Sequence, residues 1–105
     1  MDTLARLEQV IRERLSASPD KSYVAKLHAR GLPVIARKLG EEAVETITAA
    51  LSGTREELVG EAADVLFHLL VLLAETGVPL GDVLVELERR AGVSGLDEKA
   101  SRGQP

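Results

Sequence analysis

Apolar residues recur at helical spacing from the start of the chain. Between Thr3 and Ala17 they are separated by three or four positions, with charged residues between them: Leu4, Leu7, Ile11 and Leu15. This spacing places the apolar side chains on one face of a helix. The run Ser-Pro-Asp at 18–20 favours a turn. The pattern therefore predicts an amphipathic helix over residues 3–17.

Two more helices are predicted before the middle of the chain. Ser22 is placed to cap a short helix that runs to Arg30 and closes at Gly31. Helical periodicity resumes at Pro33 and continues to Ser52. Because proline is tolerated in the first turn of a helix, Pro33 is a suitable start for this third helix.

The second half predicts two further helices. Gly53 ends the preceding helix, and residues 54–57 match a Thr-x-x-Glu capping box, so the next helix starts at once. It runs to about Glu75 and ends at Gly77, and a last helix covers Leu80 to Arg90. Five helical segments without a strand pattern predict an all-α bundle with a long antiparallel hairpin.

Composition limits the class of protein. A chain of 105 residues suffices for one domain, which we assign to residues 1–92, followed by a polar tail at 93–105 that we expect to be partly mobile. The absence of cysteine excludes disulfides and Cys-based zinc sites. No signal peptide or membrane span is evident, so we expect a cytoplasmic protein. The net charge of −4 argues against nucleic-acid binding.

The charges are unevenly distributed. Between residues 21 and 40 all charged residues are basic: Lys21, Lys26, Arg30, Arg37 and Lys38. Acidic residues dominate from Glu41 to Glu61. A basic segment followed by an acidic one suits a ligand that carries both phosphates and a metal ion.

Four acidic residues form two pairs that flank the predicted turn. Residues three apart share a helix face, as Glu42 and Glu45 do, and as Glu61 and Asp64 do. In sequence, Glu45 and Glu61 are equally distant from Gly53, and so are Glu42 and Asp64. Since helices joined by so short a turn run antiparallel, with axes roughly 8–10 Å apart, we expect four carboxylates in one gap.

Four carboxylates in one gap repel each other unless a cation lies between them. Oxygen ligands favour Mg²⁺, with Mn²⁺ as a possible substitute, and such a metal would polarise a phosphoryl oxygen and lower the pKa of a water. Taken alone, Glu41, Glu56 and Glu57 read as a solvated face. The helix with Glu61 and Asp64 is instead apolar on nearly every side, so it is predicted to be buried, which favours a metal site and a homodimer.

Three residues near the acidic pairs allow two interpretations each. His68 either makes core hydrogen bonds or touches substrate. Lys38 either pairs with Glu42 or reaches a phosphate. Gly40, a glycine in mid-helix, allows close approach of either substrate or another helix.

The run Lys38-x-Gly40-Glu41-Glu42-x-x-Glu45, followed by Glu61-x-x-Asp64-Val65-Leu66-Phe67-His68, resembles the phosphoribosyl-ATP pyrophosphohydrolase family. This family belongs to the all-α nucleotide pyrophosphohydrolases, which include MazG and the dimeric dUTPases. Segments 22–31, 80–90 and 94–102 resemble the same family, so the likeness covers nearly the whole chain. One departure is Phe67, where tyrosine is common.

The resemblance implies a MazG-like fold and Mg²⁺-dependent conversion of phosphoribosyl-ATP to phosphoribosyl-AMP and pyrophosphate in histidine biosynthesis. It implies metal binding by Glu42, Glu45, Glu61 and Asp64, with Glu41 assisting either in metal binding or in positioning the attacking water. Glu41, Glu42 and Glu45 are thereby the catalytic candidates. Charge and location make further residues candidates for substrate contacts: Lys21, Lys26, Arg30, Lys38 and His68. The next enzyme, a cyclohydrolase, is expected to be a separate protein.

Two other functions remain open on the sequence. A housekeeping pyrophosphohydrolase acting on dUTP, dCTP or damaged triphosphates would use the same metal chemistry with a different base pocket. A non-catalytic helical dimerisation module would explain the apolar helix, but it gives no reason for acids placed symmetrically about Gly53.

Overall fold

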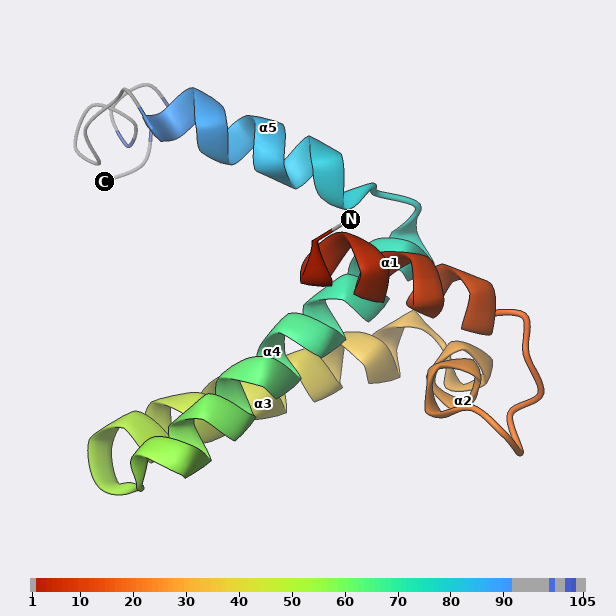
Figure 1. The fold of residues 1–105 in the computed structure, drawn as a ribbon, viewed down its shortest axis with the longest axis horizontal. Coiled ribbons are helices and arrows are strands. Elements are labelled where there is room, and N and C mark those ends of the chain that lie inside the picture. The colour runs from red at the N-terminus through yellow and green to blue at the C-terminus, as the bar shows by residue number, and fades with distance from the viewer. Residues whose placement is uncertain (1, 92–98, 100–101, 104–105) are drawn as a thin grey trace.

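The computed structural model describes residues 2–91, 99, 102 and 103, and residues 2–91 contain five α-helices and no strand (Figure 1). The predicted all-α fold is therefore confirmed. The predicted tail, 93–105, lies almost entirely outside the described residues. The helices are α1 (Thr3–Arg14), α2 (Tyr23–Arg30), α3 (Leu32–Ser52), α4 (Arg55–Thr76) and α5 (Leu80–Ala91).

The predicted caps form as expected. The Ser22 hydroxyl accepts a hydrogen bond from the Ala25 N–H at the start of α2, at 3.2 Å. Thr54 accepts one from the Glu57 N–H at the start of α4, at 3.1 Å. At the other end of α4, Gly77 adopts a left-handed φ of 75°, which closes the helix.

The first helix is shorter than predicted. It ends at Arg14, and residues 15–17 form a turn instead of continuing to Ala17. The Ser16 hydroxyl donates to the Glu13 carbonyl at 3.4 Å. Serine offers the backbone such local alternatives to helical hydrogen bonds, which explains the early end.

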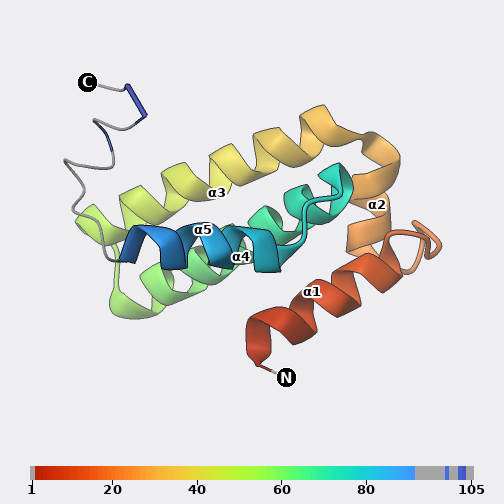
Figure 2. The ribbon, with the colours of Figure 1, turned by 90° about the horizontal axis from the view of Figure 1, so that it is seen from above.

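Helices α3 and α4 form the predicted antiparallel hairpin and make the most extensive contact in the fold (Figures 1 and 2). The chain passes close to α3 at the turn, because a Cβ at Gly53 would lie 3.0 Å from the Ala49 backbone. Helix α1 packs against α4, and α2 packs against α3 at the end of the hairpin away from this turn. The hairpin is thereby fixed as the scaffold for the acidic pairs.

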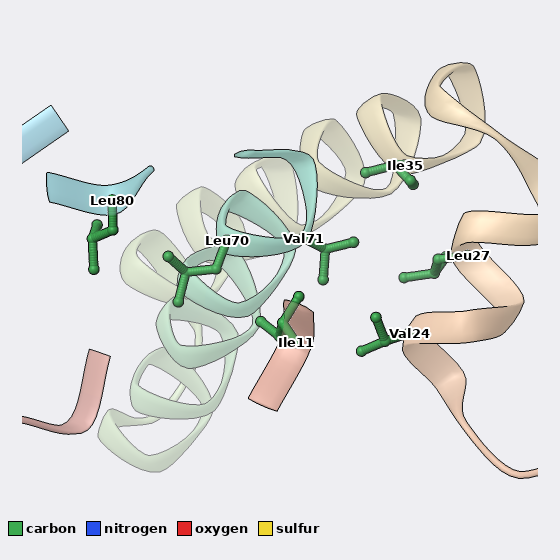
Figure 3. Close-up of a cluster of buried hydrophobic side chains, with 7 residues drawn as sticks. All are labelled: Ile11, Val24, Leu27, Ile35, Leu70, Val71 and Leu80. Atoms are coloured by element: carbon green, nitrogen blue, oxygen red, sulfur yellow. The ribbon is translucent and has the colours of Figure 1, made fainter. Parts of the chain in front are cut away.

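The core draws on all five helices (Figure 3). It is aliphatic, and it lies at the end of the hairpin remote from the turn. Each fully buried aliphatic side chain contributes about 1.5–3 kcal/mol to folding. The buried residues of this core are Ile11, Val24, Leu27, Ile35, Leu70, Val71 and Leu80.

Helix α4 is not buried on every side within a single chain, so the predicted burial would need a second chain. Val59 and Leu66 on α4 are exposed, although Leu70 and Val71 are buried. The reason is that the other helices cover only one end of the hairpin, which leaves apolar positions near the turn uncovered.

Helix α5 makes only sparse contact with the other helices. Its first N–H, at Leu80, donates to the Glu8 carboxylate at 2.7 Å, so α1 caps α5. Beyond this cap its apolar residues Leu84, Val85 and Leu87 are exposed. No helix in the described part of the chain is long and apolar enough to cross a membrane.

Candidate metal centre

Three of the four predicted acids converge between the hairpin helices. Glu42 and Glu45 on α3 and Glu61 on α4 each offer one carboxylate oxygen, and these oxygens all lie within 4.8 Å of one another. The equal distance of Glu45 and Glu61 from Gly53 thus places them side by side, as the sequence predicted.

The fourth acid, Asp64, is exposed and lies outside this three-carboxylate cluster. Its negative charge nevertheless contributes to the raised pKa of Glu42, so it lies near the cluster. The predicted square of four acids becomes three converging carboxylates with a fourth beside them. Metal binding by Asp64 stays a prediction.

Among the described residues, no cation compensates the carboxylates of the cluster. One oxygen of Glu42 and one of Glu61 are buried with no hydrogen-bond partner in that part of the chain. Within residues 2–91, no lysine or arginine forms an ion pair with an acid of the cluster. Buried charge without a partner is costly, which is the condition that a bound cation relieves.

The proximity of the acids shifts their protonation. Burial, followed by the neighbouring Glu45, raises the pKa of Glu42. A hydrogen bond with Glu45, together with burial, raises the pKa of Glu61 to about 7. Because Mg²⁺ binds deprotonated carboxylates, its binding would compete with the proton that these raised pKa values favour.

The donor set fits a hard divalent cation. All the converging ligands are carboxylate oxygens, which Mg²⁺ and Mn²⁺ prefer. With metal–oxygen distances near 2.1 Å, adjacent ligands of an octahedral Mg²⁺ lie about 3.0 Å apart and opposite ligands about 4.2 Å apart. The three oxygens lie within 4.8 Å of one another, so they would have to move closer together to share one ion.

The predicted assistant Glu41 lies on a different face of α3. It is exposed and lines an open groove with Arg37, Gly40, Val44 and Glu45. Glu45 therefore belongs both to the cluster and to this groove. A Cβ at Gly40 would meet nothing within 4 Å, so packing within the described chain does not require this glycine.

Arg37 in this groove was not among the predicted site residues. Its spacing of four and eight residues from Glu41 and Glu45 is a signal that could have identified it, because such residues share a helix face.

The predicted phosphate contacts occupy two places. Lys21, Lys26 and Arg30 are exposed on α2 and the loop before it, whereas Lys38 is half-buried one helical turn before Glu42. None of these cations forms an ion pair within residues 2–91, so Lys38 does not pair with Glu42. All four remain available to an anionic ligand.

His68 is a hydrogen-bonded core residue. It is buried, and its Nδ1 donates to the Asp64 carbonyl at 2.8 Å, since a carbonyl can only accept. In the neutral ring Nε2 then accepts from the Tyr23 hydroxyl at 3.1 Å. A substrate contact would require one of these bonds to break, and it stays a prediction.

A second hollow, of about 260 Å³, lies between the cluster and the hairpin turn. Thr48, Ser52 and Glu57 line it together with Glu45 and Glu61 of the cluster. These three residues were also missed. Thr48 and Ser52 follow Glu45 at helical spacing, but their residue types alone indicate no chemistry.

Comparison with known proteins agrees with this geometry. The family model for phosphoribosyl-ATP pyrophosphohydrolase matches residues 4–91. A phosphoribosyl-ATP pyrophosphatase of Erythrobacter litoralis is 64% identical over 103 residues, which cover 98% of this chain and 99% of the relative. Proteins of the same name from Rhizorhabdus wittichii and Novosphingobium aromaticivorans are 63% and 60% identical, over 95% and 96% of this chain and 94% of each relative.

Proposed function

The chain belongs to the phosphoribosyl-ATP pyrophosphohydrolase family, and from this premise we propose that the cluster of Glu42, Glu45 and Glu61 is where it releases pyrophosphate from phosphoribosyl-ATP. It is a pyrophosphohydrolase of histidine biosynthesis, like the relatives that carry this name. The observation that supports the location is the convergence of three carboxylate oxygens, which no cation within residues 2–91 compensates.

The proposed cofactor is Mg²⁺, held by Glu42, Glu45 and Glu61, with Asp64 as a further ligand. When bound, the ion supplies positive charge to the phosphate oxygens and acidifies a water. The carboxylates of the cluster would hold the divalent ion in place. Lys38 lies one helical turn from Glu42, and in this proposal it contacts a phosphate of the substrate.

The remaining predicted residues have supporting roles in this proposal. Glu41 lies next to Glu42 in sequence and is exposed, so it is available to orient the attacking water. Lys21, Lys26 and Arg30 provide unpaired positive charge near the start of α3, where it attracts the phosphorylated substrate. The attacking water forms a bond to one phosphorus of the α–β anhydride and loses a proton. The bond between that phosphorus and the bridging oxygen breaks, and the products are phosphoribosyl-AMP and pyrophosphate.

The direct test is a turnover assay with purified protein. We expect phosphoribosyl-ATP to be cleaved to phosphoribosyl-AMP and pyrophosphate with Mg²⁺ and not with excess chelator. A panel of dUTP, dCTP and ATP measured in parallel tests the substrate. Cleavage of a panel member without cleavage of phosphoribosyl-ATP would assign the cluster to a housekeeping triphosphate pyrophosphohydrolase.

We also propose that the protein is a homodimer joined through the hairpin. Exposed apolar residues of the hairpin are spaced seven positions apart. On α3 these are Val44 and Leu51, and on α4 they are Val59 and Leu66. This is the repeat with which helices pack against other helices. Ile47 lies between the first two and is 59% exposed, and Leu51 is 82% exposed. Two such hairpins would cover each other as a four-helix bundle.

We expect the double substitution Ile47→Glu and Val59→Glu to convert the dimer to a monomer at micromolar concentration. Each introduced carboxylate would be buried in the interface without a partner, at a cost of several kcal/mol. Light scattering after size-exclusion chromatography measures the mass. Ala29→Glu, on the exposed side of α2, is the matched control. A double variant that remained dimeric would place the interface elsewhere.

The product is proposed to pass to a separate cyclohydrolase in the cytoplasm. The chain covers 99% of the Erythrobacter litoralis relative, so that relative has no room for a second catalytic domain. The substrate is a phosphorylated biosynthetic intermediate, and this supports the proposal that the protein acts in the cytoplasm. Copurification is not expected, because a diffusible product needs no stable complex.

A further inference from the structure

Two recesses flank the carboxylate cluster, and they differ in charge. The hollow toward the turn is lined by Glu45, Glu57 and Glu61 and by the hydroxyls of Thr48 and Ser52, without a lysine or arginine among its lining residues. The groove that shares Glu45 with the hollow is lined by Arg37 as well as by Glu41. Arg37 forms no ion pair within residues 2–91.

This asymmetry orients a substrate that carries many phosphates. Phosphate oxygens are repelled by the three acids of the hollow, which has no cation, whereas the groove offers them Arg37 beside its acids Glu41 and Glu45. With the scissile anhydride at the cluster, the pyrophosphate end lies toward Arg37. The hollow must then accept the nucleoside end of the molecule.

The nucleoside end of phosphoribosyl-ATP differs chemically from that of ATP. Its adenine is substituted at N1, which converts the N1–C6–N6 unit into an amidine. An amidine binds a proton far more readily than the adenine ring of ATP does. The protonated unit is a planar cation with an N–H donor, which a carboxylate binds better than it binds a neutral adenine.

We propose that Glu57 is a specificity-determining residue that recognises the cationic, N1-substituted adenine in this hollow. The proposal rests on the proposed function. Glu45 and Glu61 are engaged by the metal, which leaves Glu57 as the acid of the hollow that is free to bind the base. A site built around this charge favours phosphoribosyl-ATP over the abundant ATP.

Glu57 also has a local structural role. Its N–H donates to Thr54 Oγ1 at 3.1 Å, and the Thr54 hydroxyl donates to Glu57 Oε1 at 3.3 Å, which completes the capping box. The other oxygen, Oε2, lies 3.0 Å from where a Cβ of Gly53 would be, beside the hollow. Since glutamine also serves in a capping box, Glu57→Gln removes the charge and keeps the cap.

The test compares ATP with N1-methyl-ATP as competitive inhibitors of phosphoribosyl-ATP turnover with Mg²⁺. N1-methyl-ATP carries the amidine without the second ribose phosphate, so it isolates the effect of the base. We expect it to bind the wild type about tenfold more tightly than ATP, as one charged hydrogen bond allows. We expect no difference between the two inhibitors in Glu57→Gln.

Glu56→Gln is the matched control, because it removes one charge from the same helical turn at a residue outside the hollow. It should keep the tenfold preference. A wild type without the preference, or a Glu57→Gln variant that retains it, overturns the assignment of Glu57 while phosphoribosyl-ATP turnover continues. A wild type that does not cleave phosphoribosyl-ATP at all overturns the proposed function and this inference together.

Discussion

Replacement of Glu61 by glutamine is expected to lower kcat/KM for phosphoribosyl-ATP by roughly 10²–10³-fold, as loss of one preorganised electrostatic contact does in other enzymes. Glu61 is the only acid that α4 contributes to the three-carboxylate cluster. Glutamine has the same shape but cannot balance a divalent cation. Steady-state kinetics at saturating Mg²⁺ measure the loss.

The same substitution should not destabilise the metal-free protein. The raised pKa of Glu61, to about 7, results from its hydrogen bond with Glu45 and from burial, so its negative charge is unfavourable when no cation balances it. Glutamine removes that charge, and we expect the melting temperature without metal to stay level or rise. Such a combination separates a functional residue from a structural one.

Two further variants provide comparisons for the loss of kcat/KM in Glu61→Gln. Glu56→Gln changes an exposed acid of α4 outside the cluster and should leave kcat/KM unchanged. Asp64→Asn should cause a smaller loss than Glu61→Gln, because Asp64 lies beside the cluster and not in it. Full activity in Glu61→Gln would exclude the cluster as the site of hydrolysis.

The position of the site could be predicted because it depends on local rules. The end of α3 at Gly53 and the cap at Thr54 fix a short antiparallel turn, and residues at equal distance from it then lie side by side. This was sufficient to pair Glu45 with Glu61. For Glu42 and Asp64, which lie further from the turn, the same rule placed them near each other without making both part of the cluster.

Other features could not be predicted because they depend on how separate helices pack. Nothing in the sequence pairs Tyr23 with His68, since their hydrogen bond joins α2 to α4. The sequence also could not predict that Glu57 lines the hollow. The capping box already accounts for an acid at this position, so the residue type indicates no second role. Apolar periodicity predicted which residues avoid water, but it could not tell burial within a chain from burial between chains.

Magnesium is expected to stabilise the fold, and more so as the pH rises. Without metal, the pKa values of Glu42 and Glu61 are raised above the ordinary 4.5, the latter to about 7. A raised carboxyl pKa means that the folded state binds the proton more tightly than the unfolded state does. The stability from these two groups is therefore fully present below pH 4.5 and is lost as the pH rises toward 7.

Mg²⁺ acts in the opposite sense, because it binds the deprotonated carboxylates. At a hundredfold excess over its Kd, a ligand of the native state adds about 2.7 kcal/mol, which raises the melting temperature of a domain this size by roughly 10 °C. We expect this difference between Mg²⁺ and chelator at about pH 8 and almost none at about pH 5. Measuring it as a difference at each pH cancels the titration of every group remote from the metal. An equal Mg²⁺ effect at both pH values would mean that the ion binds somewhere other than these protonated acids.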